Sequence, residues 1–203
     1  MISLHRKFVF VHVNKTGGTS IVEALSQFED RTEEDVLHDH SPFAAYKRVL
    51  GLDLWNEFYT FGFIRNPYER MVSAYEYRRQ ILEVQKETMD AKNKAFADWV
   101  FDFVAPKVKR QKFSEWTNQM RLLGDGEKPM VEDLFLFEEM ESAWETIQSK
   151  LGISEELPHT NKTVKKPLGE YYRGNDEVRD LVREFHLNDF AWAESNGINW
   201  DCE

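Results

Sequence analysis

A lysine, two glycines and three hydroxyl-bearing residues stand close together near the start of the chain, in the sequence N-K-T-G-G-T-S at residues 14–20. Adjacent glycines allow the backbone to approach a ligand closely and to turn its N–H groups toward it. The lysine adds a positive charge, and the hydroxyls add hydrogen-bond donors. These residue types suit a phosphate or sulfate group. The candidate contacts are Lys15, Thr16, Gly17, Gly18, Thr19 and Ser20.

This loop stands between a predicted strand and a predicted helix. The apolar run from Phe8 to Val13 predicts a buried strand, and apolar residues at helical spacing predict a helix over residues 19–28. The start of that helix would present free N–H groups and the positive end of its dipole to the loop, which favours an anion. A glycine turn with a solvated lysine is the alternative interpretation of these residues alone.

A second strand-turn-helix unit follows. The apolar sequence F-Y-T-F-G-F-I at residues 58–64 predicts a strand. Asn66 suits a helix N-cap and Pro67 suits the first helical position. Arg65 would then lie at the end of the strand, and Ser73 about two turns into the helix.

The rest of the chain adds one more strand and several helices. The pattern predicts a strand over residues 134–137, a loop over 157–168, and helices over 42–51, 80–103, 140–151 and 178–185, the first with Ser41 as N-cap and Gly51 as its end. Strands that alternate with helices predict an α/β layered fold with a parallel sheet. A length of 203 residues suits a single domain over 1–203.

Composition restricts the class of protein. The net charge of −10 argues against broad nucleic-acid binding. The single cysteine, Cys202, excludes an internal disulfide, so we expect a cytoplasmic protein. The apolar stretch near the N-terminus is too short for a signal peptide or a membrane span. No metal-ligand spacing is visible in the sequence.

The motifs together resemble one enzyme family. The order K-T-G-G-T-S resembles the loop that holds the 5′-phosphosulfate of 3′-phosphoadenosine 5′-phosphosulfate (PAPS) in sulfotransferases, although Asn14 stands where the family often has proline. Residues 65–73 resemble the 3′-phosphate-binding segment of the same superfamily, in the family order. Residues 131–140 and 157–163 resemble its later strand and its nucleotide-closing loop. The pair Tyr171-Tyr172 follows that loop, as in carbohydrate-type members. The chain as a whole resembles the heparan- and chondroitin-type branch, including small anchorless bacterial members.

This resemblance implies a P-loop-like three-layer fold and in-line transfer of the sulfuryl group from PAPS to an acceptor hydroxyl, which leaves PAP and needs no metal. It implies that Lys15 neutralises the leaving group and that the glycine loop holds the 5′-phosphate. Arg65 and Ser73 would hold the 3′-phosphate. Lys162 would add a contact, with a solvated loop lysine as the alternative. A carbohydrate acceptor is favoured, and a small alcohol, a phenol or a peptide tyrosine stays open.

A general base must take the proton of the acceptor, and histidine is the usual choice near neutral pH. His38 and His40 stand between the two phosphate motifs, and in an extended segment they face the same side. The H-x-H spacing resembles a segment of the 2-O-sulfotransferases acting on heparan sulfate, in which the second histidine matches the catalytic one. We therefore predict His40 as the base, and we expect a core or supporting role for His12. Two surface loop histidines are the alternative.

Two other functions are weighed against this one. A P-loop-type small-molecule kinase is disfavoured because its G-x-x-x-x-G-K-[ST] loop places the lysine after the glycines, whereas Lys15 precedes them. A non-catalytic nucleotide-binding module is disfavoured by the candidate base. Turnover of PAPS with mixed acceptors separates the three.

Overall fold

The computed structural model describes residues 1–30, 37, 40–84, 95–110, 118–158 and 165–202. The chain forms two compact units. The first comprises Met1–Arg65 and Glu115–Asn161, and the second comprises Asn66–Ser114 and Lys162–Glu203. The glycine loop belongs to the first unit.

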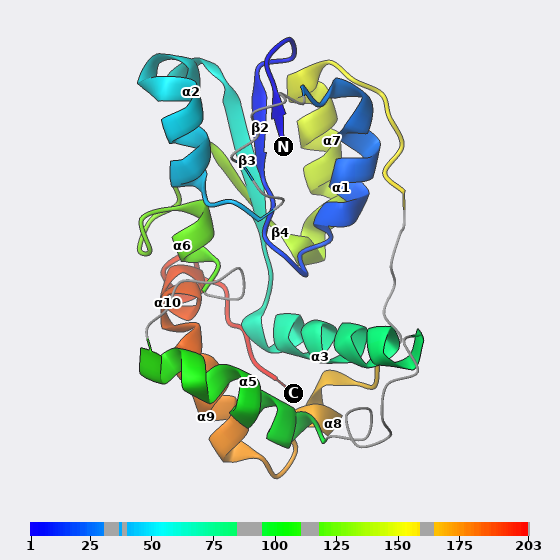
Figure 1. Cartoon of the computed structure of the whole chain (residues 1–203), viewed down its shortest axis with the longest axis vertical. Coiled ribbons are helices and arrows are strands. Elements are labelled where there is room, and N and C mark those ends of the chain that lie inside the picture. The colour runs from blue at the N-terminus through cyan, green and yellow to red at the C-terminus, as the bar shows by residue number, and fades with distance from the viewer. Residues whose placement is uncertain (31–36, 38–39, 85–94, 111–117, 159–164, 203) are drawn as a thin grey trace. The chain divides into compact units, whose positions relative to one another are not determined.

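A four-stranded sheet forms the centre of the first unit (Figure 1). Its strands, in their order across the sheet, are β1 (Ile2–Ser3), β2 (Phe8–Val11), β3 (Tyr59–Ile64) and β4 (Asp133–Leu136). β2, β3 and β4 are parallel, with Phe10 paired to Phe61. These three strands form the predicted parallel sheet. β1 is added to it antiparallel to β2, with Ile2 paired to Val9, so the sheet as a whole is mostly parallel. A two-residue strand carries too short a pattern to be predicted.

Helices cover both faces of this sheet. They are α1 (Gly18–Leu25), the 3-10 turn η1 (Ser26–Phe28), α2 (Phe43–Glu57), α6 (Met120–Leu123), the 3-10 turn η2 (Phe137–Glu139) and α7 (Met140–Leu151). Figure 1 shows α1 and α7 on one side of the sheet and α2 on the other. Ile21 of α1 and Ile147 of α7 are fully buried in one cluster with Phe10 and Phe61 of the sheet. The predicted three-layer α/β arrangement is confirmed.

The helix predicted over residues 42–51 differs in both ends. Pro42, rather than Ser41, occupies the cap position, and the helix continues to Glu57. Gly51 was predicted to end the helix, and instead it kinks it with φ of 78° and ψ of 167°. Glycine tolerates this conformation, so the chain can bend there and resume the helix.

The second unit is helical. Its described helices are α3 (Pro67–Val84), α5 (Phe96–Arg110), α8 (Leu168–Tyr172), α9 (Asp176–Phe185) and α10 (Leu187–Ser195). Tyr68, Val72 and Tyr75 recur at helical spacing and are buried, so the apolar side predicted for this segment is confirmed. The helix predicted to be the last is followed by α10, and only His186 separates the two.

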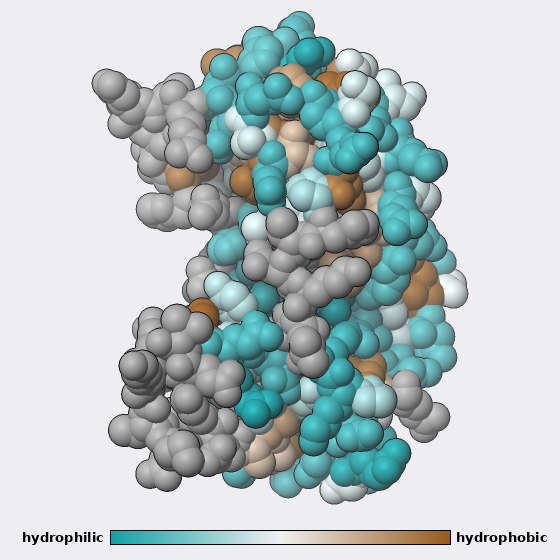
Figure 2. Space-filling view, turned by 90° about the vertical axis from the view of Figure 1, so that its right-hand side faces the viewer, coloured by the Kyte–Doolittle hydropathy of each residue, from teal (hydrophilic) through white to brown (hydrophobic). Residues whose placement is uncertain are grey.

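None of the described helices combines the length and the apolar composition that a bilayer crossing requires. Large apolar side chains do reach the surface at Leu52 and Leu187, each 59% exposed. On the face shown in Figure 2, the coloured hydrophobic residues occur singly or in small groups among hydrophilic ones. Scattered exposure of this kind is normal for a folded protein and marks no particular site.

Candidate active site

The glycine loop connects β2 to α1 and begins at the edge of the sheet where the parallel strands end. Gly17 precedes α1 with φ of 74°, in the left-handed region that favours glycine. A Cβ atom at Gly17 would lie 2.5 Å from Cε of Met140. A Cβ atom at Gly18 would overlap the imidazole of His12. The loop therefore needs glycine at both positions, and the backbone at the start of α1 carries no side chain there.

The three hydroxyl residues of the loop have different surroundings. Thr16 is fully buried, and its hydroxyl donates to the carbonyl of Val13 at 2.8 Å. This hydrogen bond stabilises the turn. Ser20 is buried in the first turn of α1, and its backbone N–H donates to the carbonyl of Gly17 at 3.1 Å. Thr19 is exposed.

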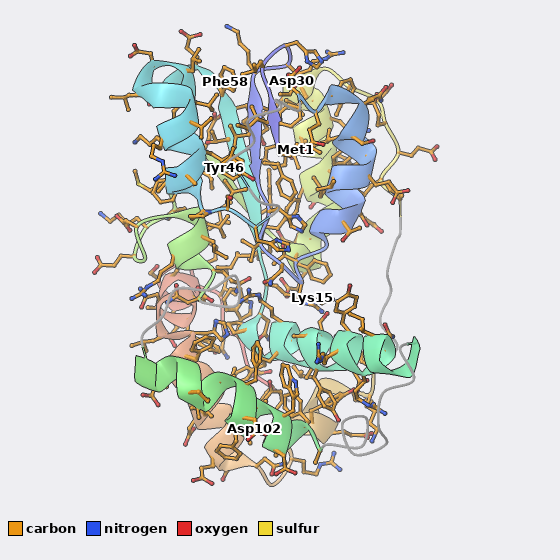
Figure 3. All side chains as sticks on the ribbon, in the orientation of Figure 1. Met1, Lys15, Asp30, Tyr46, Phe58 and Asp102 are labelled. Carbon is orange, nitrogen blue, oxygen red and sulfur yellow. The ribbon has the colours of Figure 1, made fainter. Side chains whose placement is uncertain are left out.

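Lys15 lies half-buried at the turn between β2 and α1 (Figure 3). Its φ of 64° turns the backbone, and its carbonyl accepts a hydrogen bond of 3.1 Å from Nη1 of Arg65. Burial, and then the positive charge of Arg65, lower the pKa of Lys15 to about 8. Two neighbouring cations disfavour one another, and an anion between or beside them would relieve that repulsion.

Arg65 follows β3 directly and, besides its hydrogen bond to Lys15, it contacts Gln119 and Phe137 of the first unit. Its backbone N–H donates to Oε1 of Gln119 at 3.0 Å, and Nε2 of Gln119 donates to its carbonyl at 2.8 Å. Its guanidinium lies over the ring of Phe137, 4.2 Å from the ring centre. The side chain is only 7% exposed. These contacts fix Arg65 next to the glycine loop.

Gln119 and Phe137 were not predicted as site residues. Phe137 follows β4 directly, at the same edge of the sheet as the glycine loop, so strand order could have indicated it. Gln119 is fully buried, and its side-chain amide pairs with both backbone groups of Arg65. No local sequence pattern signals such a pairing between residues 54 positions apart.

Ser73 belongs to α3 in the second unit, where it is buried. Arg65 belongs to the first unit. The joint binding of one 3′-phosphate by Arg65 and Ser73 therefore stays a prediction. The cap predicted for this segment is present, because Oδ1 of Asn66 accepts a hydrogen bond of 2.9 Å from the backbone N–H of Tyr68.

The structure brings His40 and His12 together in the first unit. Nδ1 of His40 lies 3.2 Å from the carbonyl oxygen of His12. The two rings meet edge to face, with their centres 4.5 Å apart and their planes at 68°. His12 in turn lies against Gly18 of the glycine loop. The ring of His12 therefore lies between His40 and the start of α1.

Two of the predicted residues lie outside the described part of the chain. They are Lys162, predicted to contact the nucleotide, and His38, the other histidine of the H-x-H segment. Their roles stay predictions.

The described residues thus form one group at the edge of the sheet where the strands end. It contains a backbone without side chains at the start of α1, two adjacent cations and a half-buried imidazole. Free N–H groups at a helix start and neighbouring cations suit an oxyanion such as phosphate or sulfate. An imidazole beside them has the chemistry of a proton acceptor. The group fits the transfer of an anionic group to a hydroxyl.

Comparison with known families agrees with this chemistry. The protein-family model described as "Sulfotransferase family" matches residues 1–191. The match includes every candidate residue from Lys15 to Lys162. Comparisons with curated proteins and with solved structures found no match.

Proposed function

The chain belongs to the sulfotransferase family, and we propose that it transfers the sulfuryl group of PAPS to a hydroxyl of a carbohydrate, with His40 as the general base. The family implies PAPS as the donor. The acceptor, the base and the contacts of each residue make up the proposal.

The hydrogen bond between Arg65 and the Lys15 carbonyl carries the proposal. It joins the glycine loop to Arg65, so the first residue of the second phosphate motif lies beside the first motif within the first unit. A 5′-phosphate site alone, as in a simple nucleotide-binding loop, would not require a buried arginine at this place. A nucleotide with phosphates on both the 5′ and the 3′ position makes use of both motifs.

The reaction divides between the residues as follows. PAPS supplies a sulfuryl group bonded to an oxygen of its 5′-phosphate. The acceptor oxygen attacks the sulfur, a new O–S bond forms, the S–O bond to the 5′-phosphate breaks, and the acceptor proton passes to His40. Lys15 stabilises the negative charge that moves onto the departing phosphate oxygen. The backbone N–H groups at residues 17–19 hold the 5′-phosphate in position.

The preference for carbohydrate rests on the branch resemblance. Tyr171 and Tyr172, which contribute to that resemblance, are buried in the second unit. The hydroxyl of Tyr171 donates to Glu76 at 2.6 Å, and that of Tyr172 donates to the carbonyl of Tyr68 at 3.1 Å. Their hydroxyls therefore stabilise the helical unit.

Turnover of PAPS with a panel of acceptors tests the proposal. The panel contains sulfate-free glycosaminoglycan oligosaccharides, a simple phenol, a small alcohol and a tyrosine peptide. We expect acceptor-dependent release of PAP, highest with an oligosaccharide. His40→Ala should lower kcat on the order of 10²–10⁴-fold while PAP still binds.

His5→Ala is the matched control, because His5 pairs with Asp30 at 3.1 Å and is no candidate site residue. It should keep the activity of the unchanged protein. PAP release that no acceptor increases, or a fully active His40→Ala variant, would contradict the proposal.

A further inference from the structure

The imidazole of His12 is enclosed by three neighbours. It stacks on Phe10, with ring centres 5.5 Å apart and planes at 18°. It lies against Gly18, where any Cβ atom would overlap it. Its third neighbour is the ring of His40, which it meets edge to face at 4.5 Å. A ring enclosed in this way has one orientation, and it offers His40 a fixed surface.

The backbone of the same residue also contacts His40. Its carbonyl oxygen lies 3.2 Å from Nδ1 of His40, and a carbonyl can only accept a hydrogen bond. Nδ1 of His40 must therefore carry the hydrogen in the neutral ring. The second nitrogen, Nε2, is then left as the atom that can take a proton.

We infer that His12 is a positioning residue for His40: its carbonyl sets the tautomer of the His40 ring, and its imidazole sets the orientation of that ring. The inference rests on the proposed role of His40 as the base. A base that is misplaced by about 1 Å can lose on the order of 10²-fold in rate, so the contact matters for catalysis.

The charge state of His12 fits this role. Burial, and then the positive charges of His40 and of the N-terminal amino group, lower the pKa of His12 to about 3. His12 therefore stays neutral near pH 7. It does not compete for the acceptor proton, and it adds no positive charge that would oppose protonation of His40.

Two substitutions test the inference. His12→Ala removes the ring, and we expect kcat to fall roughly 10- to 100-fold while the Kd for PAP stays within about twofold. His12→Phe keeps an aromatic ring of similar shape and should restore most of the lost rate. If His12→Phe is as slow as His12→Ala, the nitrogens of His12 act chemically, and the inference is wrong.

A double variant separates positioning from general support of the glycine loop. In the His40→Ala background, His12→Ala should cause no further loss of rate, because the residue it positions is gone. A further loss in that background would overturn the inference, as would a loss of PAP affinity as large as the loss of rate. An active His40→Ala variant would instead contradict the proposed base, so the two failures are distinguishable.

Nitrogen NMR of the protein without substrate gives a readout besides activity. Two-bond ¹H–¹⁵N correlations should show the neutral His40 ring with its hydrogen on Nδ1. His12→Ala keeps this carbonyl but removes the ring that orients His40. The His40 ring should then leave the carbonyl part of the time and show both tautomers. A His40 ring with its hydrogen on Nε2 in the unchanged protein would overturn the inference.

Discussion

The positive charges of Lys15 and Arg65 lie close enough to affect each other. The guanidinium of Arg65 donates to the Lys15 carbonyl at 3.1 Å, and its charge adds to the effect of burial in lowering the pKa of Lys15 to about 8. Lys15 is therefore mostly charged at pH 7, but it holds its proton less firmly than a solvated lysine does. A bound anion supports the charged form and raises this pKa.

Proton uptake on binding follows from this pKa. At pH 8.5, a large part of Lys15 is neutral in the free protein, and PAP should draw a proton onto it. We expect roughly half a proton or more to be taken up for each PAP bound. Calorimetry at pH 8.5 in two buffers of different ionisation enthalpy measures this number. Lys15→Met, which keeps an unbranched side chain of similar length, should show almost none.

Proton uptake that does not depend on Lys15 would contradict this prediction. If the unchanged protein and Lys15→Met take up the same number of protons, Lys15 does not contact the anion. Its assignment to the leaving group would then be wrong.

The site residues that could be predicted from the sequence are those that lie close together along the chain. The loop residues 15–20 share one turn, so their joint placement follows from the strand before them and the helix after them. Gln119 and Phe137 were not predicted because they contact Arg65 although they lie far from it in the sequence. The contact of His12 with His40 could not be predicted, because it depends on the path of the chain between the two residues and no local pattern indicates that path.

The element that matters most is the β2–α1 connection. It holds Gly18 so close to the His12 ring that a methyl group has no room. Alanine at a helix start would otherwise be favourable, since it restricts the unfolded chain more than glycine does. At Gly18, an alanine methyl group would overlap the enclosed His12 ring, so we expect the substitution to be unfavourable there.

Gly18→Ala should therefore weaken the site even though it favours the helix. We expect the added methyl group to displace the His12 ring and to lower PAP affinity roughly tenfold, which corresponds to about 1–2 kcal/mol. Gly152→Ala is the matched control, because Gly152 ends α7 with φ of 61° and a Cβ atom there meets no atom within 4 Å. It should lose about 1 kcal/mol of stability and keep its PAP affinity.

Unchanged PAP affinity in Gly18→Ala would show that the start of α1 does not hold the nucleotide. Thermal unfolding of both variants shows whether each is folded under the conditions of the binding measurement.

Helices and strands could be predicted from the sequence where their apolar pattern is long and continuous. β2, β3, α1 and α7 agree with prediction to within a few residues, because their apolar periodicity extends over most of each element. The end of α2 was wrong because Gly51 can kink a helix as well as end it. α10 was missed because one residue, His186, serves both as the end of α9 and as the start of α10.

At the scale of the whole molecule, the net charge of −10 contrasts with a site proposed for a polyanion. Salt screens exposed charges beyond about 8–10 Å, so distant acidic residues act weakly on a bound nucleotide. Lys15 and Arg65 lie at the site itself and are partly shielded from water, so their attraction is stronger. An acidic protein can therefore hold an anion at one local site.

The domain organisation was predicted as a single domain over residues 1–203. The structure forms two compact units, one built on the sheet and one of helices, and the chain passes between them more than once. A single domain predicts one cooperative transition in urea unfolding. No linker-like composition marks the points where the chain changes unit, and the single domain stays a prediction.

Binding of nucleotides that differ only in their 3′-phosphate tests the central claim, namely that the glycine loop and Arg65 form one site for a 3′,5′-bisphosphate. Calorimetry compares PAP with AMP, and with adenosine 2′,5′-bisphosphate as a control of equal charge. A charge-assisted contact left unmade costs about 1.5–3 kcal/mol, so PAP should bind at least roughly tenfold more tightly than AMP, and also more tightly than the 2′,5′ isomer. Arg65→Ala should remove most of this preference. Equal affinity for PAP and AMP in the unchanged protein would contradict the account.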